Sequence, residues 1–168
     1  DQRWPGDLIE RRLSSPKSVR FSADMKKIYV NSLEGGITHV FRWPDLRQIK
    51  VISHNFTRDH SRLFNNEITV FGYPYFARSR SGDPNQFRGK PVESELSHNG
   101  RWLWIPYYRR DFDTYGKSPS AVAIVDTETD EIVRVMPTGP IPKYVAASPD
   151  GRYVAIIHWG DNTVGLID

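Results

Sequence analysis

The sequence contains no cysteine among its 168 residues. Disulfides, thiolate metal sites and cysteine nucleophiles are therefore excluded from the chemistry of this chain. Long apolar runs are also missing, because no segment approaches the ~20 apolar residues that a membrane-spanning helix needs. We therefore expect a folded domain that contains no membrane span.

An excess of either charge is also lacking. The chain has 23 Lys and Arg against 20 Asp and Glu, which gives a formal net charge of +3. A nucleic-acid surface needs basic residues clustered on one face, whereas here they are spread along the chain. We therefore expect no nucleic-acid partner.

The familiar catalytic motifs are missing as well. The chain has no Gly-x-Ser-x-Gly nucleophile turn, no glycine-rich phosphate loop and no His-Glu-x-x-His zinc motif. What is present suits a β-sheet protein, with 12% aromatic residues and 12 each of glycine and proline for turns. The length allows one domain with a core of its own.

A serine-containing turn occurs three times, each time between two short strands. In the last copy Pro149 presets φ and Gly151 tolerates positive φ, so Ser148 to Gly151 predicts a tight turn. The three turns are Ser22–Lys26, Ser97–Gly100 and Ser148–Gly151.

Each turn belongs to a longer repeating unit of strands. The middle copy predicts four strands, at Val92–Ser97, Arg101–Pro106, Ala121–Asp126 and Glu131–Met136. Four antiparallel strands in sequence make one blade of a β-propeller. The spacing between the turns exceeds the ~40–50 residues of common propeller repeats, so insertions must separate the copies.

Several segments resemble the YVTN-type β-propeller repeat, which is related to lactonase-like propellers. They are Ile28–Asn31, the Ser148–Gly151 turn, Asp161–Val164 and Ala123–Thr127. The resemblance implies an all-β partial propeller of four-stranded antiparallel blades, which is a segment of a seven-bladed parent ring. It also implies a bacterial periplasmic or cell-surface location.

The repeat divides the single domain 1–168 into segments. We predict a last strand of a preceding blade at 1–13, a blade at 14–53, a long insertion at 54–91, a blade at 92–136 and an incomplete blade at 143–168. Propellers close with roughly 4–8 blades, so about three blades leave an open arc. We expect that this chain alone forms no closed ring.

Strand direction places the long loops together on one face, where function is expected. The loop from Tyr107 to Gly116 sets two guanidiniums among Tyr and Asp side chains, which suits a carboxylate, a phosphate or a sugar acid. The alternative is an internally salt-bridged loop that packs its aromatic rings on its neighbours. The candidate ligand-binding residues are Tyr107, Arg109, Arg110, Asp111, His158 and Trp159.

His158 and Trp159 form a second candidate, because a histidine beside an aromatic ring can bind a ligand or act as a base. Ordinary turn chemistry of the following Asp161 and Asn162 is the alternative. His54, Asp59 and His60 in the long insertion can ligate metals, but their spacing matches no familiar site. We therefore predict no metal and no cofactor here, while a cation such as calcium stays open for a full-length parent.

These patterns favour a non-catalytic scaffold of the bacterial envelope that binds a small molecule, a glycan or a protein on its long-loop face. The alternative is a lactonase-like hydrolase or a dehydrogenase-like propeller enzyme with its site at the central channel. Such an enzyme needs acidic or histidine side chains that converge from several blades, and the chain offers Glu34, Asp111, His158 and Asp161.

Overall fold

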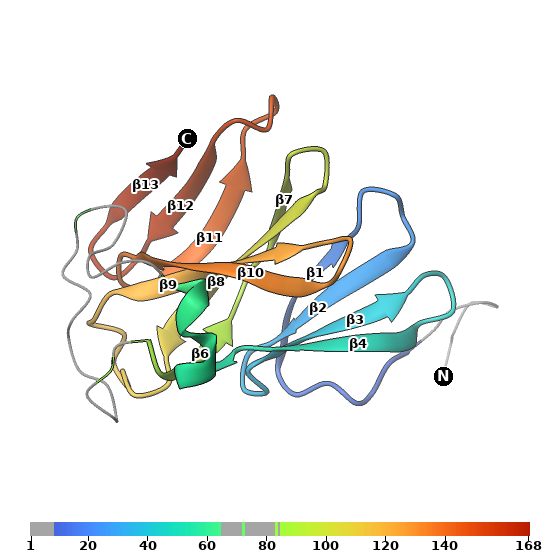
Figure 1. Cartoon of the computed structure of the whole chain (residues 1–168), viewed down its shortest axis with the longest axis horizontal. Coiled ribbons are helices and arrows are strands. Elements are labelled where there is room, and N and C mark those ends of the chain that lie inside the picture. Colours follow the sequence, from blue (N-terminus) through green and yellow to red (C-terminus); the bar gives the residue numbers. More distant parts are fainter. Residues whose placement is uncertain (1–8, 65–71, 73–82, 84) are drawn as a thin grey trace.

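The computed structural model describes residues 9–64, 72, 83 and 85–168. Three antiparallel sheets follow one another along the chain and stack face to face in an open arc (Figure 1). This arrangement confirms the predicted all-β partial propeller. We call the sheets blades 1, 2 and 3.

Blade 1 contains four strands in sequence order: β1 (Pro16–Phe21), β2 (Lys27–Ser32), β3 (Ile37–Arg42) and β4 (Arg47–Ser53). Met25 takes a φ of 60° in its first turn, the left-handed conformation that Gly151 adopts in the third copy. Residues 9–13 form no strand. The assignment of 1–13 to a preceding blade therefore stays a prediction.

Blade 2 contains strands β5 (Asn55–Phe56), β6 (Phe87–Pro91), β7 (Glu95–Ser97), β8 (Trp102–Arg110), β9 (Ser120–Asp126) and β10 (Glu131–Thr138). The 3-10 helix η1 (Arg58–Leu63) follows β5. Blade 3 contains β11 (Pro142–Ala147), β12 (Val154–His158) and β13 (Thr163–Ile167).

Blade 2 corrects two predicted boundaries. The predicted strand Val92–Ser97 is a strand only from Glu95 to Ser97 (β7), and a further strand, β6, precedes it at Phe87–Pro91; both pair with β8. The predicted loop beginning at Tyr107 is strand as far as Arg110. The cause is long-range pairing, because β6 emerges from the insertion and gives the end of β8 a partner for its backbone groups.

Two apolar layers hold the blades together. Tyr29 and Val40 of blade 1 pack with Leu103 and Ile105 of blade 2 in the first layer. In the second layer, Trp104 and Ile124 of blade 2 pack with blade 3, whose contributions are Val145, Val154 and Ile156. Strand β9 is buried along its whole length because both faces of blade 2 are covered.

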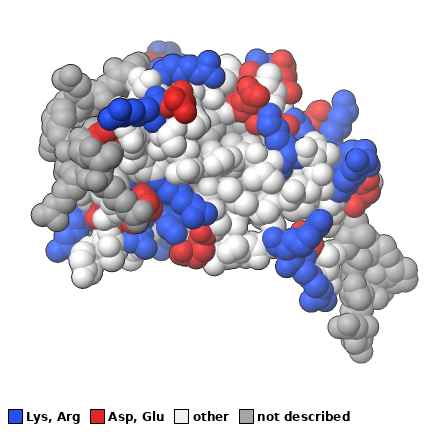
Figure 2. All heavy atoms as spheres, turned by 60° about the horizontal axis from the view of Figure 1, so that its bottom comes forward, with Lys and Arg blue, Asp and Glu red and all other residues white. Residues whose placement is uncertain are grey.

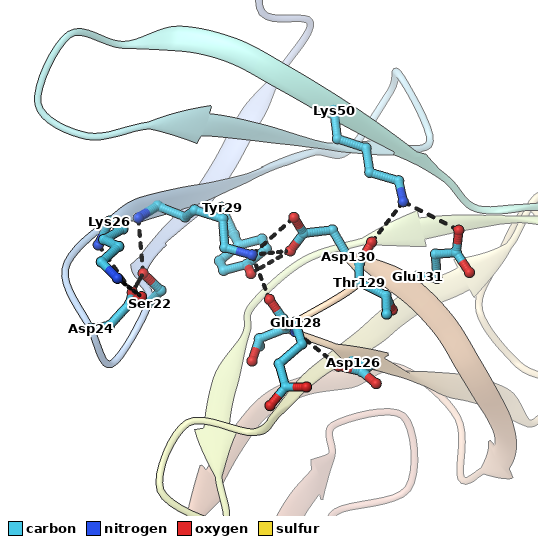
Figure 3. A network of polar contacts seen from close by, with 12 residues as sticks. Ser22, Asp24, Lys26, Tyr29, Lys50, Asp126, Glu128, Thr129, Asp130 and Glu131 are labelled. Atoms are coloured by element: carbon cyan, nitrogen blue, oxygen red, sulfur yellow. Dashed lines mark hydrogen bonds and ion pairs between the residues drawn. The ribbon is translucent and has the colours of Figure 1, made fainter.

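Polar contacts reinforce the first interface at the tight-turn end (Figure 3). Lys27 Nζ lies 2.8 and 2.9 Å from the two carboxylate oxygens of Asp130, and the Tyr29 hydroxyl donates to the same carboxylate at 2.6 Å. Burial, helped by this acceptor, raises the pKa of Tyr29. Lys50 Nζ donates to the Thr129 carbonyl at 2.8 Å. Ion pairs and hydrogen bonds at the tight-turn end therefore connect blade 1 to blade 2.

Charged side chains of both signs are interspersed on the face drawn in Figure 2, with an uncharged area between them. Within the described ranges, no helix is long and apolar enough to cross a membrane.

Candidate functional site

The loops β8–β9, β10–β11 and β12–β13 meet at one end of the blades. The Trp159 amide donates to the Ile141 carbonyl at 3.0 Å. Gly116 lies against the same residue, since a Cβ there would stand 2.7 Å from Ile141 Cγ1. The loops that follow Tyr107 and His158 therefore share one end, as the strand directions predicted.

A cavity of about 610 Å³ opens at this end between blades 1 and 2. Three cationic side chains and one carboxylate stand among its walls, and backbone from two glycines forms part of its rim. Its lining residues are Gly35, Gly36, Ile37, Ser53, Asn55, Arg88, Lys90, Arg109 and Asp111.

Strand β6 supplies two of the cations. Arg88 and Lys90 are two residues apart and so project from the same side of the strand. The turn after β8 holds this strand in place, because the Asp111 amide donates to the Arg88 carbonyl at 2.9 Å. The Arg88 amide in turn donates to Asp111 Oδ1 at 3.0 Å.

The loop between β2 and β3 makes room for Arg88. Gly36 has a φ of 60°, and a Cβ at this position would lie 2.4 Å from Arg88 Nε. The guanidinium also donates to the carbonyl of Gly35. A side chain at residue 36 would therefore displace Arg88 from the cavity wall.

The cavity has an excess of positive charge. Lys90 Nζ lies 2.8 Å from Glu34 Oε2, and this hydrogen bond, with the charges of Lys90, Arg109 and Arg88, lowers the pKa of Glu34. Arg109 donates to the Asp113 carbonyl at 3.1 Å. Three cations thus face the two carboxylates of Glu34 and Asp111, an arrangement that favours an anionic or oxygen-rich ligand.

A buried polar chain lies beneath the cavity. The Tyr107 hydroxyl is 2.9 Å from His54 Nδ1, and His54 Nε2 is 2.8 Å from Thr38 Oγ1. Complete burial lowers the pKa of His54 to about 3, so its imidazole is neutral. Gly89 packs on the Tyr107 ring, where a Cβ would lie 2.7 Å from Cδ1. Tyr107 therefore supports β6 from below.

Of the six predicted ligand-binding residues, Arg109 and Asp111 line the cavity. Tyr107 and Arg110 are fully buried, and the Arg110 guanidinium lies 4.7 Å from the centre of the Phe112 ring. Their burial places them in the packing under the loops.

The two remaining predicted residues belong to blade 3. His158 is buried, with Nε2 2.7 Å from Thr138 Oγ1. Burial lowers its pKa, partly opposed by the charge of Asp161. Trp159 is exposed at the loop end, and Lys143 Nζ lies 4.5 Å from its ring centre.

No motif of the blade repeat predicts Arg88 and Lys90 as site residues, because both lie in the insertion at 54–91. The available signal was the alternation Arg88-Gly89-Lys90, with two cations on one side of an extended segment. His60 bonds its own helix cap at Thr57, and no group of three or more metal-ligating side chains occurs where the structure is described. The sequence also favours an extra strand at residues 68–71, and these residues lie outside the described part of the chain.

Fold and site together define an arc of a propeller with a basic cavity on its loop face. No protein-family profile matches the chain, and no curated protein sequence matches it. Solved structures do match.

A putative 6-phosphogluconolactonase from Bacteroides uniformis has a TM-score of 0.58 and 20% identity, over 94% of this chain and 37% of its own. A second, from Bacteroides fragilis, has a TM-score of 0.59 and 20% identity, over 91% and 34%. The periplasmic gluconolactonase of Pseudomonas aeruginosa has a TM-score of 0.58 and 20% identity, over 95% and 37%. The chain thus spans about a third of the length of these proteins.

The comparisons identify the fold as that of a lactonase-like β-propeller segment. Four of the matching solved structures are named as lactonases, and this finding contradicts the expectation of a non-catalytic scaffold.

Proposed function

We propose that this chain forms part of a lactonase-like hydrolase, and that its basic cavity receives the lactone of a sugar acid. The main observation behind this proposal is the cavity at the loop end. Three cationic side chains, Arg88, Lys90 and Arg109, line it together with one carboxylate, Asp111. The names of the structural neighbours support the same reaction class.

The chemistry of lactone opening suits this set of side chains. Water attacks the carbonyl carbon, and the carbonyl oxygen takes up negative charge that the Arg88 and Arg109 guanidiniums stabilise. Asp111 accepts a proton from the attacking water. The bond from the carbonyl carbon to the ring oxygen then breaks, the ring oxygen takes up a proton, and a hydroxy acid leaves as its carboxylate.

Further parts of the proposal rest on resemblance. We propose that the repeat is of the YVTN type and that the protein works in the periplasm or at the cell surface. The periplasmic gluconolactonase among the structural neighbours supports this setting. The partner is then a small sugar acid on the long-loop face, with no nucleic acid involved.

The test is acid release from δ-gluconolactone at constant pH, with spontaneous hydrolysis subtracted. We expect the chain to accelerate hydrolysis, and Arg109→Ala to lower the rate about 10–100-fold through loss of a donor to the oxyanion. Lys26→Met, in the exposed turn at the opposite end of blade 1, is the matched control and retains the full rate.

Two results of the rate measurement contradict the proposal. One is the absence of any acceleration by the unaltered chain, and the other is an unchanged rate in Arg109→Ala. Calorimetric binding of gluconate without hydrolysis would also overturn it, because the cavity would then be a binding site for sugar acids alone.

A further inference from the structure

His54 joins the two walls of the basic cavity through its backbone. Its amide donates to the Gly36 carbonyl at 3.1 Å, and its carbonyl accepts from the Gly89 amide at 2.9 Å. Gly36 belongs to the wall that blade 1 supplies, while Gly89 stands between the two cations of β6, Arg88 and Lys90. The peptide groups on either side of His54 therefore set how far β6 lies from the loop that receives Arg88.

The hydrogen-bond directions around the His54 imidazole follow from Asn31, at the far end of a buried chain. The Asn31 amide nitrogen lies 3.1 and 2.9 Å from the carbonyls of Val92 and Glu93, so the nitrogen donates and Oδ1 is left to accept. The Thr38 hydroxyl donates its single proton to this Oδ1 at 2.6 Å. Thr38 Oγ1 must then accept from His54 Nε2, which lies 2.8 Å away.

The other imidazole nitrogen holds Tyr107. His54 is neutral because it is completely buried, and a neutral imidazole with its proton on Nε2 can only accept at Nδ1. The Tyr107 hydroxyl therefore donates to His54 Nδ1 at 2.9 Å. This bond fixes the Tyr107 ring, on which Gly89 packs so closely that a Cβ would lie 2.7 Å from Cδ1. His54 thus holds β6 twice, by its carbonyl and through Tyr107.

Strand β6 depends on these contacts because its own pairing is irregular. Its register with β8 shifts between Gly89 and Pro91, and Pro91 has no amide proton to donate. On its other side β6 pairs with β5, which is two residues long. The contacts of His54 therefore reinforce a short ladder and fix the strand that carries Arg88 and Lys90.

We propose that His54 is a positioning residue of the cavity, whose imidazole keeps Arg88 and Lys90 where they face a bound anion. His54 is fully buried and is not among the lining residues, so it acts through β6 and not by contact with a ligand. The kinetic consequence rests on the proposed lactonase function, in which Arg88 stabilises the oxyanion. The placement of Arg88 itself is measured without a substrate.

Thr38→Val tests the arrangement from outside the cavity. Valine keeps nearly the shape of threonine but has no hydroxyl, so His54 Nε2 loses its acceptor. Thr38→Ser retains a hydroxyl and is the matched control. The side-chain NMR signal of Arg88 should move in Thr38→Val and keep its position in Thr38→Ser, while the amide signals of blade 3 stay in place in both variants.

Two further measurements decide the question if circular dichroism shows that Thr38→Val does not fold. Long-range proton–nitrogen correlation of the unaltered chain at neutral pH should place the imidazole proton of His54 on Nε2. Tyr107→Phe retains the ring beneath Gly89 and removes the donor to Nδ1, so it should also move the Arg88 signal.

The rate of δ-gluconolactone hydrolysis gives the functional readout. We expect Thr38→Val to lower kcat about 10-fold with KM nearly unchanged, because Arg88 acts on charge that develops in the transition state. Thr38→Ser should stay within about twofold of the unaltered chain.

The positioning role is overturned by an imidazole proton on Nδ1, by an Arg88 signal that stays fixed in the folded variants, or by an unchanged kcat when Thr38→Val is made in an active chain. An unaltered chain that does not accelerate hydrolysis overturns the lactonase proposal alone, because the NMR measurements still decide where Arg88 stands.

Discussion

At the scale of single residues, one position recurs in all three blades. Ser32, Tyr107 and His158 each stand ten residues after the turn serine of their blade, and each is buried in the strand that follows this turn. Each bonds a residue of the segment that lies just before the first strand of its blade. Their partners are the Ser14 carbonyl, the His54 imidazole and the Thr138 hydroxyl. Serine, tyrosine and histidine thus make the same kind of contact, which ties the strand after the tight turn to the segment just before the blade.

The buried His54 should make stability depend on pH. Its pKa is about 3 in the folded chain against an ordinary value of 6.5, so the unfolded chain binds the extra proton between these values. Stability is therefore greatest above pH 6.5 and falls as pH drops toward 3, by up to about 1.4 kcal/mol per pH unit.

Urea unfolding between pH 7 and 5 measures this slope, and His54→Gln is the comparison. The variant is less stable at pH 7 because Thr38 and Tyr107 lose their partner, but its slope over this range is shallower. Equal slopes in the two proteins would contradict a neutral buried His54.

At the scale of elements, the turn between β9 and β10 joins two blades. Asp130 adopts a φ of 55°, which aspartate and asparagine tolerate, and its carboxylate takes bonds from Lys27 and Tyr29 of blade 1. The same short turn thus reverses the direction of the chain and supplies the carboxylate that binds blade 1.

Asp130→Asn should therefore destabilise the chain by about 2–4 kcal/mol, since it leaves the largely buried Lys27 ammonium without its counter-charge. Asparagine retains the turn conformation, so the effect reports the charge. Asp45→Asn, in the exposed pair with Arg42, is the control and should leave the urea midpoint nearly unchanged. Equal shifts of the urea midpoint in the two variants would contradict this prediction. They would mean that hydrogen bonds from Lys27 to backbone carbonyls at the interface stabilise it without the charge of Asp130.

At the scale of the whole molecule, the arc behaves as a stack in which each blade touches only its neighbours. Blade 2 belongs to both apolar layers, whereas blade 3 belongs only to the second. Such arrays lose stability unit by unit from their ends. Blade 1 is also an end unit, but its interface is the larger apolar layer and is reinforced by the Lys27–Asp130 pair, so blade 3 should open at the lowest free energy of the three blades.

Ile156→Ala should speed amide exchange in β11, β12 and β13, because it leaves a cavity in the layer between blades 2 and 3 that costs about 2–5 kcal/mol. Exchange in β1 to β4 should change little. Hydrogen exchange with mass spectrometry resolves the strands, and Val133→Ala on the exposed side of β10 is the control. Equal acceleration in all three blades would mean that the arc unfolds as one unit.

The amino-acid sequence by itself determined the blade repeat, the turns and the end of the arc where long loops gather. These features are local, because turn residues and alternating strands lie within a few positions of one another. The sequence also pointed to Arg109 and Asp111, which line the cavity.

Only the tertiary structure decided which neighbouring side chains reach that cavity. Strand β6 pairs with the end of β8 with a register shift between Gly89 and Pro91, and this pairing brings Arg88 and Lys90 to the wall. The same pairing buries Tyr107 beneath them. Register between strands far apart in the chain depends on the packing of both, so no local pattern contains it.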